Sequence, residues 1–232
     1  LYKFKLNFFF LPKHHWTQYL QKTYEPETFE KIKEIFRDNS IRNFWDIGAN
    51  IGLYSLYCAS VHRNKSKIYA FEPSTSNLRV LSRNIFFKNF QKDISINQLP
   101  LTSIPNTFLP MRENDFQEGI SLNTFGENFN FEGKEFNSKN EYSILGSSID
   151  YLVEKKIMEI PDYIKIDVDG IEHLILKGGE NTLKEKKIKS ILIEVNDNFL
   201  EQKNKVNEFM IGSGFTLKKK TIEKNIPVKE EF

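Results

Sequence analysis

Apolar positions along the chain follow two periods, and the periods predict alternating helices and strands. A helical period, with apolar residues three or four positions apart, covers residues 26–37, 53–62 and 77–89. Short apolar runs typical of buried strands lie at residues 43–47, 67–71, 94–97, 163–168 and 190–195. This order predicts βαβ units, and therefore an α/β fold with a mostly parallel central sheet and helices on both faces.

Two regions depart from this rhythm. Residues 1–40 combine an aromatic and basic N-terminus with the first helix, and we expect a cap on a domain that spans residues 41–232. Residues 112–143 are rich in Asn, Glu, Gly and Ser, with Phe interspersed. A connection of this length in a compact domain is usually functional or disordered, and its Phe content argues against disorder. We expect an insertion, in the form of a hairpin over the active-site edge; an ordinary extension of the sheet is the alternative.

Composition and charge narrow the class of protein. Hydrophobic residues make up 39% of the chain, enough for a core, which excludes a disordered protein. Lys and Arg number 33 against 31 Asp and Glu, and this balance predicts no nucleic-acid partner. The single Cys58 excludes an intrachain disulfide and a multi-cysteine zinc site. No apolar run is long enough to span a membrane, and we expect a cytoplasmic location.

The clearest chemical signal is the turn between the strand at 43–47 and the following helix. It reads Asp46-Ile47-Gly48-Ala49-Asn50-Ile51-Gly52-Leu53-Tyr54-Ser55. Gly48 permits a tight turn with positive φ, and the helix start offers free N–H groups to a polar or anionic ligand. Glu72 ends the next strand, where a carboxylate can accept hydrogen bonds from both hydroxyls of a ribose. Together these features predict an adenosine-type cofactor at the carboxyl ends of the first two strands.

The spacing of the glycines distinguishes between cofactors. A dinucleotide fingerprint that starts at Gly48 needs glycines at positions 50 and 53, where this chain has Asn50 and Leu53. A phosphate-binding P-loop signature is also absent from the sequence. The turn therefore favours a ligand without a pyrophosphate, which points to S-adenosylmethionine. A nicotinamide-dependent oxidoreductase is the weaker alternative.

A second group of charged residues lies on the strand near residue 165. A period of two places Lys165 and Asp167 on the same side of this strand. A lysine in a buried strand is costly unless it is paired, so we expect Lys165 to pair with Asp167 or with Glu194 of the following strand. The pair is either part of the catalytic site or a buried ion pair without a catalytic role.

Carboxylates at the end of this strand are the catalytic candidates. Methyl transfer is an in-line displacement in which the enzyme mainly supplies orientation, and a hydroxyl acceptor also benefits from a base. Asp167 is the first candidate for the base or for the group that orients the acceptor; Asp169, Glu172 and Lys165 are the other catalytic candidates. The same acids can instead stabilise the start of the next helix, and we expect no metal site.

These blocks in their order resemble the FkbM family of S-adenosylmethionine-dependent methyltransferases. The matching residues are Asp46–Ser55, Ala70–Pro73, Ser148–Asp150, Ile164–Glu172 and Ile193–Val195. The resemblance implies a class I Rossmann-like methyltransferase fold and methylation of a hydroxyl on a sugar, glycan, polyketide or other small molecule. Two features depart from the family: Asp169 stands where the family more often has Glu, and the chain ends soon after residues 215–219. We therefore expect the last strand pair to be incomplete.

The sequence thus predicts an O-methyltransferase with S-adenosylmethionine as its cofactor and a small-molecule or glycan hydroxyl as its acceptor. A catalytically silent Rossmann-like binding module is the alternative from another class. The residues expected to bind the cofactor are Asp46, Gly48, Ala49, Asn50, Gly52, Tyr54, Glu72 and Asp167.

Overall fold

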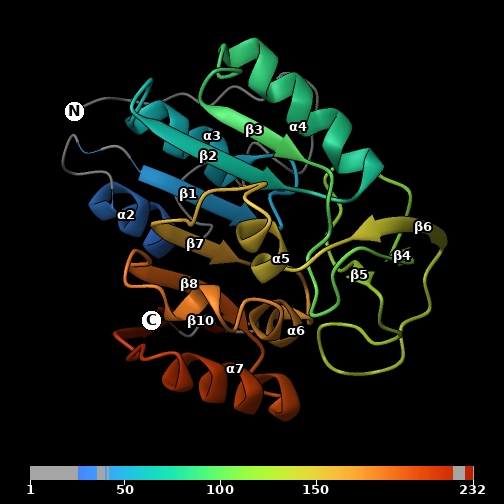
Figure 1. Ribbon diagram of the computed structural model, residues 1–232. Coiled ribbons are helices and arrows are strands. Elements are labelled where there is room, and N and C mark those ends of the chain that lie inside the picture. Colours follow the sequence, from blue (N-terminus) through green and yellow to red (C-terminus); the bar gives the residue numbers. More distant parts are fainter. Residues whose placement is uncertain (1–25, 36–39, 41, 222–227, 232) are drawn as a thin grey trace.

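The computed structural model describes residues 26–35, 40, 42–221 and 228–231 of the chain, and the remainder of the predicted N-terminal cap lies outside them (Figure 1). The helices are α2 (Pro26–Ile35), α3 (Leu53–Val61), α4 (Thr75–Lys88), α5 (Ile149–Glu154), α6 (Glu172–Lys177) and α7 (Leu200–Gly212), with a 3-10 turn η1 (Thr182–Lys184). The strands of the main sheet are β1 (Arg42–Ile47), β2 (Ser66–Phe71), β3 (Ile94–Asn97), β7 (Tyr163–Ile166), β8 (Ser190–Val195), β9 (Lys219–Thr221) and β10 (Val228–Glu231).

The main sheet has the strand order β3-β2-β1-β7-β8-β10-β9. Strands β3, β2, β1, β7 and β8 are parallel, and β10 is antiparallel to both of its neighbours. This confirms the predicted α/β fold with a mostly parallel sheet. The chain leaves β1 towards one edge and returns to β7 on its other side, so the strand order reverses between β1 and β7. In open α/β sheets, ligands bind at the carboxyl ends of the strands at such a point.

The expectation of an incomplete last strand pair was wrong. Val228–Glu231 pairs with β8, and Lys219–Thr221 pairs in turn with β10. These two strands form the outer edge of the sheet, where charged residues are common because they discourage pairing with other chains. Their charged sequences lack the apolar run that identified the buried strands.

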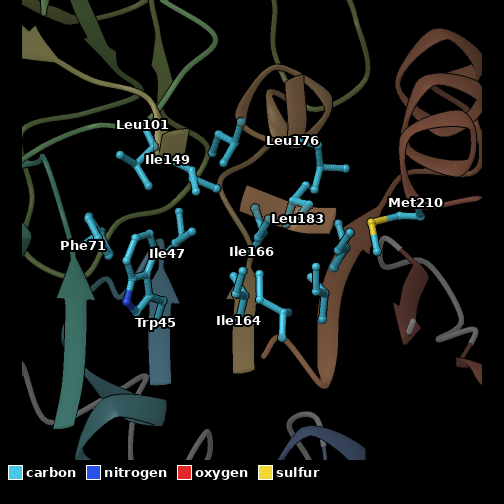
Figure 2. Packing of buried hydrophobic residues seen from close by; sticks show 14 of the residues in the cluster. Trp45, Ile47, Phe71, Leu101, Ile149, Ile164, Ile166, Leu176, Leu183 and Met210 are labelled. Carbon is cyan, nitrogen blue, oxygen red and sulfur yellow. The ribbon is translucent and has the colours of Figure 1, made fainter. Parts of the chain in front are cut away.

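Helices cover both faces of the sheet, and its central strands are therefore buried on both sides. Phe44 of β1 packs in a core with α2, α3 and α4. The next residue, Trp45, points to the opposite face and packs with Ile47 and Phe71 against α5, α6 and α7 (Figure 2). This alternation also places Asp46, like Phe44, on the face covered by α3. A charged residue at this position is therefore buried inside the protein.

The residues around the predicted insertion form a second, separate sheet. Its strands β4 (Thr107–Glu113), β5 (Thr124–Phe125) and β6 (Asn140–Gly146) are antiparallel in the order β5-β4-β6. Figure 1 shows this sheet beyond the carboxyl ends of the parallel strands. Its inner face packs on Ile171 through Met111 and Phe125. The segment is therefore a hairpin over that edge and not an extension of the main sheet.

Candidate active site

A cleft opens at the carboxyl ends of β1, β2 and β7, beneath the antiparallel sheet. Its open space, counted to the solvent at its mouth, is about 570 Å³. Of the residues predicted from the sequence, those that line it are Gly48, Asn50, Glu72, Asp167 and Asp169. The remaining candidates are Asp46, Ala49, Gly52, Tyr54, Lys165 and Glu172, which are not among the cleft-lining residues.

The turn after β1 is held close to both neighbouring strands. The N–H groups of Gly48 and Ala49 both donate to the carbonyl oxygen of Phe71 at the end of β2. Gly48 has φ +83°, and a Cβ atom there would lie 1.8 Å from the carbonyl oxygen of Asp167, so only glycine fits. Gly52 also has positive φ, but its missing Cβ makes room for Leu81 of α4. Gly52 therefore serves helix packing in this structure.

Glu72 is oriented by backbone donors at the end of β2. Its Oε2 atom accepts a hydrogen bond from the N–H of Asn50 (2.7 Å), and its Oε1 atom accepts one from the N–H of Ser74 (2.9 Å). A carboxylate has about four acceptor sites, so both oxygens retain capacity for further donors. Burial raises the pKa of Glu72 to about 7. Acceptance of the ribose hydroxyls by Glu72 stays a prediction from the sequence.

A buried charge cluster lies beneath the cleft on the α3 face. The Nζ atom of Lys165 is 2.8 Å from Oδ2 of Asp167 and 3.8 Å from Oδ1 of Asp46, and it lies 4.7 Å from the centre of the Tyr54 ring. The hydroxyl of Ser55 donates to Oδ2 of Asp46 (2.6 Å). Burial raises the pKa of Asp46, and the charge of Lys165 partly offsets this rise.

The predicted pairing of Lys165 with Asp167 is confirmed. Asp46 is a second neighbour that the sequence did not indicate. Since Lys165 and Asp46 do not line the cleft, their direct effect on it is to fix the position of Asp167.

The turn that follows β7 carries Asp169 into the cleft. Asp169 has φ +63°, a conformation that non-glycine residues rarely adopt. Its Oδ2 atom accepts a hydrogen bond from the N–H of Leu122 (2.7 Å). Burial, together with the negative charge of Asp167, raises the pKa of Asp169 to about 7. A carboxyl group of this kind can exchange a proton near neutral pH.

Glu172 supports this turn from behind. Its side chain is buried and accepts hydrogen bonds from the N–H groups of Val168 (3.1 Å) and Gly170 (3.1 Å), and from the amide of Gln202 on α7. Burial raises the pKa of Glu172 to about 7. The contacts show a residue that shapes the turn carrying Asp167 and Asp169.

Sequence reasoning missed three polar residues near the cleft. Asn77 on the first turn of α4 contacts the backbone of the β4–β5 connection. Glu113 on β4 is fully buried and accepts a hydrogen bond from the hydroxyl of Tyr142 (3.0 Å), which also contacts the carbonyl oxygen of Pro73 (3.4 Å). Of these three residues, only Asn77 could have been found from the sequence, because it is a polar residue at a helix start close to Glu72.

The strand order, the helices on both faces and the cleft at the strand reversal define a class I, Rossmann-like methyltransferase fold. A comparison with protein families matches residues 46–217 to the methyltransferase FkbM domain. The chain therefore belongs to the FkbM methyltransferase family, which confirms the resemblance drawn from its motifs.

Two curated proteins are similar in sequence. Hexuronic acid methyltransferase AglP of Haloferax volcanii is 25% identical over 191 residues, which cover 72% of this chain and 69% of that protein. Methyltransferase sdnD of Sordaria araneosa is 32% identical over 173 residues, which cover 63% of this chain and 66% of that protein. The chain thus spans about two thirds of the length of these relatives.

Solved methyltransferase structures share the fold. The FkbM methyltransferase of Methylobacillus flagellatus superposes with a TM-score of 0.56 at 18% identity, covering 84% of this chain and 44% of that chain. An O-methyltransferase from Bacillus cereus in complex with SAH gives a TM-score of 0.54 at 12% identity, covering 91% of this chain and 81% of that chain. Identities this low support the fold alone.

The described residues lack two further features. Within residues 26–35, 40, 42–221 and 228–231, no three His, Cys, Asp or Glu side chains gather in a way that could hold a metal ion. No helix in this part of the chain is both long and apolar enough to cross a membrane.

Proposed function

We propose that this protein uses S-adenosylmethionine to methylate a hydroxyl group on a sugar, a glycan or another small molecule. The observation that supports this most is the arrangement of three carboxylates on one cleft. Glu72 faces it from the end of β2, Asp167 and Asp169 face it from the turn after β7, and the Gly48 turn lies between them. The hexuronic acid methyltransferase among the relatives is consistent with a sugar acceptor.

The donor would be held on the β1–β2 side of the cleft. Glu72, held by the N–H of Asn50, would accept the two ribose hydroxyls, and the turn at Gly48 to Asn50 would allow a close backbone approach. The apolar side chains of Phe71 and Leu99, which line the same side, would contact an adenine ring. When bound, S-adenosylmethionine supplies a methyl group made electrophilic by its sulfonium.

The acceptor would meet Asp167 and Asp169. The Asp169 carboxylate would take the proton that the acceptor hydroxyl loses when its oxygen is methylated. A pKa of about 7 suits Asp169 to this role, because a general base works best when its pKa is near the working pH. Asp167, fixed by Lys165, would orient the acceptor.

The charge of the cleft favours a hydroxyl acceptor over a carboxylate acceptor. Among the described residues that line the cleft, three are carboxylates and none is a lysine or arginine. A carboxylate acceptor needs no base and would be repelled by these groups. A hydroxyl is neutral and gains from a base.

Binding and transfer can be tested separately. Calorimetric titration of the full chain with S-adenosylhomocysteine should give one site per chain, and Glu72→Ala should weaken this binding at least about tenfold through the loss of its hydrogen bonds. Asp169→Ala should retain binding but lose transfer of an isotope-labelled methyl group to hydroxyl acceptors. Glu154→Ala, which removes an exposed carboxylate outside the cleft lining, is the matched control.

The outcomes separate the candidate functions. A folded protein that binds neither S-adenosylmethionine nor its product would refute the proposal. Tight binding without transfer to any hydroxyl acceptor would favour a catalytically silent binding module.

A further inference from the structure

The connection between β4 and β5 crosses the cleft, and we name residues 119–123 of this connection the cover segment. Ile120, Ser121 and Asn123 line the cleft from this side. The cover segment belongs to neither sheet, because β4 ends at Glu113 and β5 begins at Thr124. Side chains of neighbouring elements form hydrogen bonds with its backbone.

The side-chain amide of Asn77 forms hydrogen bonds with a backbone N–H and a backbone carbonyl of the cover segment, as a neighbouring strand would. Its Oδ1 atom accepts a hydrogen bond from the N–H of Gly119 (2.8 Å), and its Nδ2 atom donates to the carbonyl oxygen of Ile120 (3.0 Å). The side chain of Asn50 donates to the same Ile120 oxygen (3.1 Å). Asn77 is only 1% exposed, so these bonds lie in a site shielded from water.

Both asparagines also belong to the wall that carries Glu72. The N–H of Asn50 donates to the Glu72 carboxylate, and Asn77 lines the cleft together with Glu72. A ligand that engages Glu72 therefore acts on the same residues that hold the cover segment. On the opposite wall, Asp169 accepts a hydrogen bond from the N–H of Leu122.

We propose that Asn77 is a positioning residue that holds the cover segment closed over the bound donor, and that donor release requires its bonds to Gly119 and Ile120 to open. This inference rests on the proposed function, because the donor is the ligand that the cover encloses. Asn77 acts through the backbone of the cover segment and makes no chemical contribution of its own. Asn50 assists it through the shared Ile120 oxygen.

Hydrogen exchange and dissociation kinetics of the full chain test this role. In the wild type, S-adenosylhomocysteine should slow amide exchange of residues 119–123. Asn77→Ala should speed exchange there without ligand, and should raise the dissociation rate of S-adenosylhomocysteine about tenfold, the factor expected from losing one or two ordinary hydrogen bonds. The association rate should not fall, because an open cover does not hinder entry.

Two further variants separate positioning from folding. Ser82→Ala, on the exposed side of the same helix, should leave both measurements unchanged. Asn50→Gly retains the positive φ and the N–H bond to Glu72 but removes the amide from Ile120, and should speed dissociation in the same direction. Asn50→Gly leaves the α4 start intact and serves if Asn77→Ala fails to fold. Because Asn50 itself lines the cleft, the deciding measurement in this variant is the exchange of residues 119–123 without ligand.

The proposal is overturned if exchange of residues 119–123 and the dissociation rate are unchanged in the asparagine variants. If the wild type does not bind S-adenosylhomocysteine, the proposed function fails instead. In that case the exchange of the ligand-free variants still decides whether Asn77 holds the cover segment: faster exchange supports it and unchanged exchange refutes it.

Discussion

Lys165 is the positive partner of the carboxylates of Asp46 and Asp167. Replacing Lys165 with methionine removes this charge and retains a side chain of similar shape. Lys165 is 2% exposed and Asp46 is fully buried. Removing one partner of a buried ion pair typically costs about 3–5 kcal/mol, because the remaining charge is left uncompensated. We expect Lys165→Met to lower the free energy of unfolding by about this amount at pH 8.

The loss should depend on pH in a defined direction. Burial already raises the pKa of Asp46 and Lys165 opposes that rise, so the pKa rises further in the variant. The folded variant then keeps a proton that the unfolded chain releases, and stability falls as the pH rises from about 4 towards the folded pKa. The destabilisation should therefore be smaller at pH 5 than at pH 8.

Urea unfolding at the two pH values measures both effects. The double variant Lys165→Met/Asp46→Asn should recover part of the loss at pH 8, because it removes a buried charge. Lys67→Met, which breaks an exposed pair with Glu159, should leave the unfolding midpoint nearly unchanged. A loss at pH 8 below about 1 kcal/mol, or an equal loss at both pH values, would show that this reasoning is wrong.

Three further predictions concern the turn, the thiol and the donor. Gly48→Ala should lower stability by more than about 3 kcal/mol in a thermal melt, whereas Gly214→Ala, with similar φ but open space around it, should cost only about 1 kcal/mol. Cys58, fully buried with its pKa raised by burial, should resist iodoacetamide in the native protein and react in denaturant. The pKa values of Glu72 and Asp169 are about 7, so both carboxyls gain negative charge between pH 6 and pH 8. Affinity for the cationic S-adenosylmethionine, relative to its neutral product, should therefore rise on the order of fivefold by calorimetry, and a constant ratio would contradict this.

Sequence patterns predicted the contacts between residues that are close together in the chain. The period of strand β7 was enough to place Lys165 beside Asp167, because two residues of one strand share a face. The proximity of Asp46 could not be found in this way. It depends on the register that sets Asp46 opposite Lys165, and this register follows from the order of strands in the folded sheet.

The contacts of the cover segment also could not be predicted from the sequence, because they join residues that are far apart in the chain. Its bonds join Asn77 to residues 119 and 120, far along the chain, and no repeating pattern of residues marks such a contact. The length and Phe content of residues 112–143 predicted an ordered insertion, but its position required the antiparallel pairing of β4 with β6.

The contact between Gly48 and the carbonyl oxygen of Asp167 leaves no space for even one methyl group. The turn after β1 and the turn after β7, which carries Asp167 and Asp169, are therefore packed without a gap, so a shift of one displaces the other. The part of the cleft lined by β4, β5 and the cover segment makes no such contact with Gly48. A mutant library restricted to that part would change the lining of the cleft and leave the two packed turns in place.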